Sequence, residues 1–169
     1  MQVTSVPPPP TAFASGGLAR VDYQDAFRLA LPEGAPETID EIARRTILAT
    51  PSWVRELMAA RDGIVRHLGL KTGGRMRALP ERFVVGDRVG IFRVVARSER
   101  EIVVGEDDAH LDFRVSFLLD GAVDRALVLS TIVCFHRALG RAYFLPVAPV
   151  HRRIVPAMLR AAGRAMAGA

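Results

Sequence analysis

The chain has 169 residues, 50% of them hydrophobic, and this composition indicates one globular domain and excludes intrinsic disorder. The formal net charge is +5, but the arginines are scattered and no base-stacking motif accompanies them, so we expect no nucleic-acid partner. No apolar run approaches the roughly 20 residues of a membrane-spanning helix, so we expect no membrane insertion. The single cysteine, Cys134, excludes an internal disulfide and is typical of a cytoplasmic protein.

Residues 1–17 are rich in proline and glycine, and they predict a flexible leader without the basic and apolar regions of a secretory signal. Residues 18–167 are expected to form a single domain. Its first strand is predicted over residues 20–31, where apolar and polar side chains alternate loosely until Pro32 and Gly34.

Two short helices are predicted next. Thr38 and Glu41 have the spacing of a capping box, and apolar residues follow at helical intervals. The second helix would use Thr50 as its cap and Pro51 at its first position, and would end at Gly69. Its expected buried stripe consists of Trp53, Leu57, Ile64 and Leu68.

Four β-rich segments follow a loop, and short polar joints divide them as in antiparallel hairpins. These segments are residues 89–99, 100–108, 110–120 and 125–137. After residue 139 the pattern is helical again, with Pro149 as the expected helix start and Pro156 as the expected site of a kink or break. The order predicts an α+β fold in which a curved sheet wraps a long C-terminal helix, with space for a ligand between them.

This order of elements resembles the helix-grip fold of the START-like, pollen-allergen-like (SRPBCC) superfamily. Three segments also resemble a bacterial family known as domain of unknown function 2867: TPSWVRELMAARDGIVRHLGLK, GEDDAHLDFRVS and LSTIVCFHRALGRAYFLPVAPVHRRIV. The resemblance covers roughly residues 20–165. The superfamily resemblance implies a cavity under the C-terminal helix that holds a small apolar ligand, and in a few members it implies a cyclisation or hydrolysis there.

The stretch GEDDAHLDFRVSFLL, residues 105–119, places charged and apolar side chains on opposite sides of a predicted strand. Phe113 and Phe117 are expected to face the C-terminal helix. The opposite side carries four side chains that we call the polar row: Asp108, His110, Asp112 and Arg114. Matching the apolar faces of the hairpin places Cys134 across from His110, and His136 across from Asp108, within a two-residue slip.

The polar row has several possible roles. It can be the solvated outer face of the sheet, which we favour. It can assist Cys134 as a nucleophile, with His110 as the base and an aspartate of the row to orient it. Its histidine and aspartates could bind a metal together with His136, but that site needs a further element for closure, so we expect no metal and no cofactor. A cyclase- or hydrolase-like enzyme would use the whole row, Arg114 included, as acid/base and anion-holding groups.

We predict that the protein binds a small apolar molecule between the sheet and the last helix. Aromatic side chains would line the cavity, and three polar groups would stand near its mouth. The predicted ligand-binding residues are Trp53, Phe113, Phe117, Phe135, Arg141, Tyr143 and His151. A structural or partner-binding module with a filled core is a further alternative. Val128, Ile132 and Cys134 are apolar on the outer side, so either a homodimer covers them or the sheet curls to bury them.

Overall fold

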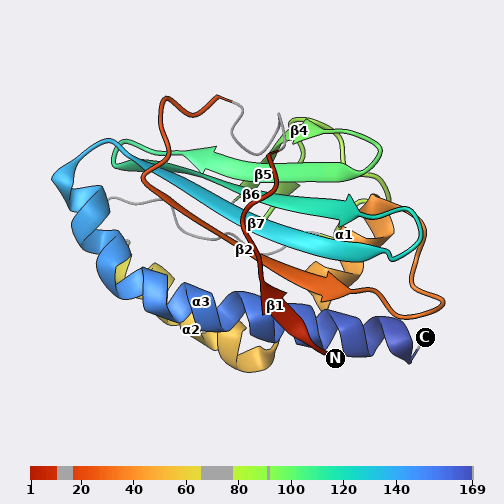
Figure 1. Ribbon diagram of the computed structural model, residues 1–169. Coiled ribbons are helices and arrows are strands. Elements are labelled where there is room, and N and C mark those ends of the chain that lie inside the picture. The colour runs from red at the N-terminus through yellow and green to blue at the C-terminus, as the bar shows by residue number, and fades with distance from the viewer. Residues whose placement is uncertain (11–16, 66–77, 91, 169) are drawn as a thin grey trace.

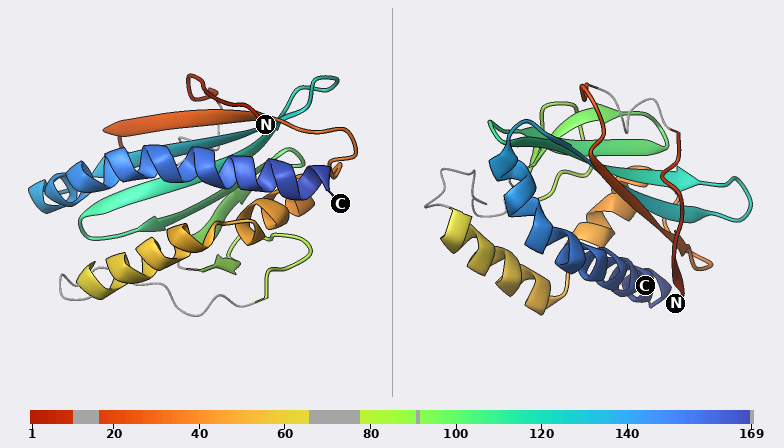
Figure 2. Two further views of the ribbon diagram at one scale, coloured as in Figure 1. Left: turned by 90° about the horizontal axis from the view of Figure 1, so that it is seen from below. Right: turned by 60° about the vertical axis from the view of Figure 1, so that its left-hand side comes forward.

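The computed structural model describes residues 1–10, 17–65, 78–90 and 92–168, without side chains for 61–65. Seven strands form one antiparallel sheet in the order β1-β2-β7-β6-β5-β4-β3, and three helices lie on one side of it (Figures 1 and 2). The α+β helix-grip plan is therefore confirmed. The elements are β1 (Val3–Ser5), β2 (Tyr23–Ala30), α1 (Ile39–Leu48), α2 (Ser52–Val65), β3 (Arg88–Val89), β4 (Phe92–Arg97), β5 (Glu101–Asp107), β6 (Leu111–Asp120), β7 (Ala126–Phe135) and α3 (Ala138–Ala167).

The inner face of the sheet, which faces the helices, carries the main core. Alternate residues of β2, β5, β6 and β7 point to this face, as the period of a strand requires. Phe117 belongs to the main core, and Phe113 packs beside a smaller cluster formed by Leu111, Val133 and Phe135. The predicted orientation of the two phenylalanines is confirmed. The core side chains that α3 contributes are Val155, Leu159, Ala162 and Met166.

The first short helix begins where its capping signal indicates. The hydroxyl of Thr38 accepts a hydrogen bond from the backbone N–H of Glu41 at 3.4 Å, whereas the Glu41 carboxylate pairs with two arginines of its own helix. The predicted cap of the second helix is wrong, because α2 starts at Ser52 and the Thr50 hydroxyl donates to the Ile47 carbonyl at 2.7 Å. The predicted stripe of α2 is wrong in part, because Trp53 is 45% exposed and Leu57 is also exposed. The buried side chain is Val54, so the face that packs is rotated by one residue from the predicted one. Gly69 and Leu68 lie outside the described residues, as does the side chain of Ile64.

The outer face of the sheet is buried by the chain itself. Val128, Ile132 and Cys134 are buried within a single copy, and so are Arg114 and Ser116 of β6. Figure 1 shows the N-terminal segment crossing in front of this face. Residues Val3–Ser5 of the predicted leader form β1 and pair with β2. The favoured interpretation, a solvated face, is therefore wrong for the centre of β6.

Helix α3 starts eleven residues earlier than Pro149, so the predicted start is wrong. Pro146, Pro149 and Pro156 all lie inside it, and the helix continues through Pro156. The two residues just before it are anchored on the carbonyl of His110, which accepts from the N–H groups of His136 and Arg137. Tertiary contacts of this kind outweigh the cost of the missing proline N–H groups. In Figure 1 the first turns of α3 descend steeply before the helix runs along the sheet.

Candidate ligand-binding groove

An open groove of about 580 Å³ lies between the start of β2, the end of β7 and the first half of α3. We call it the aromatic groove. Its wall on the sheet side is formed by Asp22, Tyr23 and Phe135, and its wall on the helix side by Arg141, Phe144, Leu145, Ala148, Pro149 and Arg152.

The helix wall is one continuous stripe of α3. Its six residues follow the spacing i, i+3, i+4, i+7, i+8 and i+11, which keeps them on the same side of the helix over three turns. The four central residues are apolar, and an arginine stands at each end. This stretch of α3 lies N-terminal to the part that fills the main core, so the two halves of the helix have different surroundings.

Three aromatic rings from different elements fix the shape of the groove. Phe144 of α3 contacts Tyr23 of β2 edge-on, with ring centres 4.7 Å apart, and contacts Phe135 of β7 with ring centres 5.4 Å apart. Tyr143, the neighbour of Phe144, packs against the small cluster behind Phe135. Edge-to-face pairs of this kind have defined geometry, so the groove has a firm aromatic wall.

A buried polar cluster lies beside the groove, on the inner face of the sheet. Asp25 of β2 and Thr131 of β7 are cross-strand neighbours, and His151 of α3 lies over both. The Nε2 atom of His151 is 3.0 Å from the Thr131 hydroxyl and 3.4 Å from Asp25 Oδ1. The Tyr23 hydroxyl donates to Asp25 Oδ2 at 2.5 Å. The cluster therefore ties the start of β2 to α3.

The charges in this cluster follow from its burial. The Asp25 side chain is only 9% exposed, and burial alone would raise its pKa. The contact with His151, the Tyr23 hydroxyl and the charge of Arg152 outweigh burial, so the pKa of Asp25 lies below its usual value of 3.8. Burial and the hydrogen bond to Asp25 raise the pKa of Tyr23 to about 12. Tyr23 is therefore neutral at pH 7, and its proton points toward Asp25.

The cluster does not have the geometry of a nucleophile triad. In such a triad the two ring nitrogens of histidine serve different partners, whereas here Nε2 of His151 faces both the Thr131 hydroxyl and Asp25. The arrangement instead leaves the Tyr23 oxygen as an acceptor at the edge of the groove, where Arg152 Nε donates to it at 3.3 Å.

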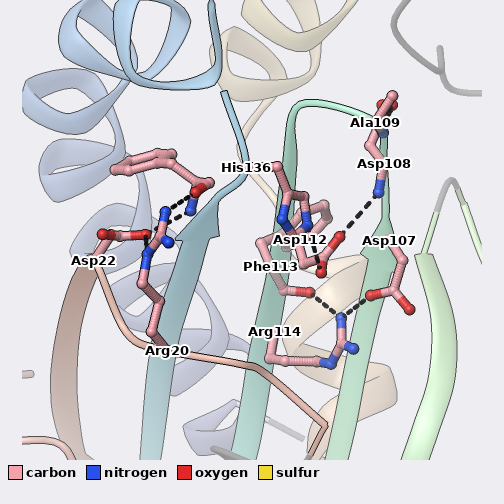
Figure 3. Close-up of polar contacts among 10 residues, drawn as sticks. Arg20, Asp22, Asp107, Asp108, Ala109, Asp112, Phe113, Arg114 and His136 are labelled. Carbon is pink, nitrogen blue, oxygen red and sulfur yellow. Dashed lines mark hydrogen bonds and ion pairs between the residues drawn. The ribbon is translucent and has the colours of Figure 1, made fainter. Parts of the chain in front are cut away.

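Asp22 holds the strand ends beside the groove. Its carboxylate accepts the backbone N–H of Phe135 at 2.7 Å and the Arg20 Nε–H at 2.8 Å (Figure 3). Arg141 is 3.5 Å away from it. The hydrogen bond from Phe135 and then that from Arg20 lower the pKa of Asp22. This carboxylate is thus ionised at neutral pH and surrounded by donors.

The polar row does not reach the aromatic groove. Figure 3 shows Asp112 paired with His136, 2.8 Å apart, and Arg114 placed between the Phe113 carbonyl and Asp107. Arg114 is 5% exposed. Asp108 donates its backbone N–H to Asp112 at 3.2 Å. These contacts hold strand ends together.

The described residues of the polar row do not form the nucleophile site or the metal site that the sequence left open. Cys134 is buried and lies across from Asp112, two residues from the predicted partner His110 and so at the limit of the two-residue slip. The Nδ1 atom of His110 is buried and has no hydrogen-bond partner among the described residues, while its carbonyl holds the residues just before α3. Among the residues that the structure describes, no three histidine, cysteine or acidic side chains are placed to hold a metal ion.

The structure separates the predicted ligand-binding residues into five places. Phe135 and Arg141 line the groove, and His151 lies in the polar cluster. Phe113 and Tyr143 pack behind Phe135. Two others lie elsewhere, Phe117 in the main core and Trp53 exposed on α2.

Sequence reasoning missed Tyr23, Asp25, Phe144 and Arg152. One signal was present, since Asp25 and Thr131 are polar residues at apolar-face positions of their strands. The helical stripe of residues 141–152 was hidden by two prolines that normally argue against a helix.

The fold and the groove define an α+β protein in which an antiparallel sheet grips a C-terminal helix and leaves an aromatic groove beside its first half. The sequence matches the model of a family described as protein of unknown function (DUF2867) over residues 18–158, and the chain belongs to this family. A search of curated proteins gave no match. Within the described part of the chain, no helix combines the length and apolar character needed to cross a bilayer.

Proposed function

We propose that this protein binds a small, largely apolar molecule in the aromatic groove. The observation that carries the proposal is an open hollow of about 580 Å³ whose walls are mainly aromatic and aliphatic. Small-molecule sites are typically of this size, with apolar walls and a few polar groups that orient the ligand. Tyr23, Phe135 and Phe144 would supply most of the apolar contact.

The contrast between the two halves of α3 supports this location. Around the C-terminal half, Leu159 and Met166 fill the space under the sheet together with Leu29 and Phe117. The first half is less buried, and Leu145 is 75% exposed at the groove. A bound apolar molecule would shield this surface from water, which is favourable at roughly 25 cal/mol per Å².

A matched pair of variants on α3 tests the proposal. Ala148 lines the groove, so Ala148→Phe should fill it, whereas Ala165 is exposed near the other end of the helix, and Ala165→Phe should leave the groove open. We expect a neutral solvatochromic dye such as Nile red to bind the wild-type protein and Ala165→Phe equally. Binding to Ala148→Phe should weaken at least about tenfold, a loss of roughly 1.4 kcal/mol.

Native mass spectrometry of protein purified without detergent would complement the dye. A co-purifying molecule that is lost in Ala148→Phe supports the proposal. If the dye binds all three proteins alike, or binds none of them, then the groove is not its site and a filled structural module becomes the better description.

Two broader expectations remain to be tested. We propose a cytoplasmic location because Cys134, the single cysteine, is a free buried thiol. Cell fractionation would test it.

The homodimer also stays a prediction, and the burial of Val128 and Ile132 within one chain removes the reason for which we expected it. Sedimentation velocity would decide between monomer and dimer.

A further inference from the structure

Two arginines mark the ends of the groove, and they differ in what surrounds them. Arg141 and Arg152 are separated by eleven residues of helix, or about 16 Å at 1.5 Å per residue, and both point to the same side of α3. Between them the wall is entirely apolar. A ligand that follows this stripe would have an apolar body with a guanidinium at each end.

The Arg141 end is close to a carboxylate. Its guanidinium is 3.5 Å from Asp22, and its side chain is 64% exposed. Asp22 also carries the closer ion pair with Arg20, so two cations share one anion there. Arg141 is therefore already paired with a carboxylate, which leaves fewer of its N–H groups for a ligand.

The Arg152 end offers a cation held by a neutral group. Arg152 Nε donates to the Tyr23 hydroxyl at 3.3 Å, and its guanidinium carbon lies 5.6 Å from the centre of the Tyr23 ring. These contacts orient the planar guanidinium against an aromatic face. Its other N–H groups are suited to a planar, two-oxygen acceptor, because a guanidinium fork matches a carboxylate. The charges of Asp25 and Arg152 attract each other, but the Asp25 carboxylate accepts its hydrogen bond from Tyr23 and lies 3.4 Å from His151.

We infer that the ligand is an apolar carboxylate whose acid group binds Arg152 and whose body lies along Phe144 toward the Arg141 end. This inference rests on the proposed function, since it names the ligand class of the same groove. The aromatic wall gives contact area, and Arg152 selects ligands that carry one negative charge at one end.

A pair of fluorescent probes that differ only in charge separates two claims. One is that the groove binds an apolar molecule, and the other is that Arg152 binds its carboxylate. Pyrenebutyrate and its methyl ester share the same apolar body, and only the acid is ionised at pH 7. We expect the acid to bind the wild-type protein roughly tenfold or more tightly than the ester, because charge-assisted hydrogen bonds to a carboxylate are the strong ones. Arg152→Gln should weaken the acid by about the same factor and change the ester less than about twofold.

The control is Arg153→Gln, an exposed residue of the same helix that does not line the groove. It should affect neither probe, and circular dichroism would establish that each variant is folded. Equal binding of acid and ester to the wild type would overturn the carboxylate inference and leave the binding function intact. Loss of the acid in Arg141→Gln but not in Arg152→Gln would overturn the assignment of its position. If neither probe binds the wild type, the proposed function itself fails.

Discussion

Leu159 is the side chain of α3 whose packing under the sheet we expect to contribute most to the stability of the fold. It is fully buried in the main core, between the sheet and α1. Leu159→Ala removes three carbon atoms and leaves a cavity, which costs about 2–5 kcal/mol in well-packed cores. For a chain of 169 residues each kcal/mol lowers Tm by roughly 2–4 °C, so a fall of about 4–20 °C is expected.

The labelling rate of the Cys134 thiol provides a second measurement of the stability lost in Leu159→Ala. The thiol is 1% exposed on the outer face of the sheet, so a thiol reagent can react only when the structure opens. When opening is fast and reversible, the labelling rate follows the open population. A cost of 2–5 kcal/mol at tenfold per 1.4 kcal/mol predicts labelling that is about 30-fold to several thousand-fold faster in Leu159→Ala.

Leu145→Ala is the matched control, because it makes the same change on the same helix at an exposed groove position. It should change stability by less than about 0.5 kcal/mol and leave the labelling of Cys134 nearly constant. Equal losses of Tm in the two variants would refute the division of α3 into a gripped half and a groove half. An unchanged labelling rate in Leu159→Ala would show that Cys134 is exposed by a local opening that does not involve the core.

Three further changes test other parts of the fold. Gly105→Ala places a Cβ against the Phe113 carbonyl and 2.7 Å from Arg114 Cδ, so we expect a cost of about 1–3 kcal/mol in urea unfolding, and no loss would contradict the packing of Arg114 over this strand. Thr38→Ala removes the cap of α1 and should cost roughly 0.5–2 kcal/mol in the same assay. The pKa of Asp25 is lower in the folded protein than its usual 3.8, so its contribution to stability is present above that value and is lost as the pH falls through the folded pKa. Asp25→Asn should therefore flatten the dependence of stability on pH below about 4, and parallel acid limbs for the two proteins would contradict this.

The elements with strong local patterns could be predicted from the sequence. The alternation along β6 placed Phe117 inward and Arg114 outward, and the hairpin with β7 has a register within the expected two-residue slip. The cap at Thr38 also lies where its spacing indicated. In each case the signal comes from neighbours within a few residues, which is the range over which a periodic pattern is informative.

The groove could not be predicted in this way, because it is formed by distant segments. Tyr23 and Phe144 are far apart in the sequence, and their contact depends on α3 starting before its prolines. The sequence of α3 argues locally for a later start, and packing around His110 overrides it. The burial of Arg114 has the same origin, since Gly17 lies next to its guanidinium and the N-terminal segment carries no periodic signal.

The different roles of the two halves of α3 also explain how its prolines are tolerated. Pro146 and Pro149 lie in the groove half, where each missing N–H leaves a carbonyl close to the surface and within reach of water. The half that fills the core contains one proline, Pro156, which is itself buried and adds to the apolar packing. Stability therefore depends mainly on residues from Val155 onward, while residues 141–152 can be shaped for a ligand. Substitutions in the groove half should then change binding with little effect on folding, as the contrast between Leu145→Ala and Leu159→Ala is designed to measure.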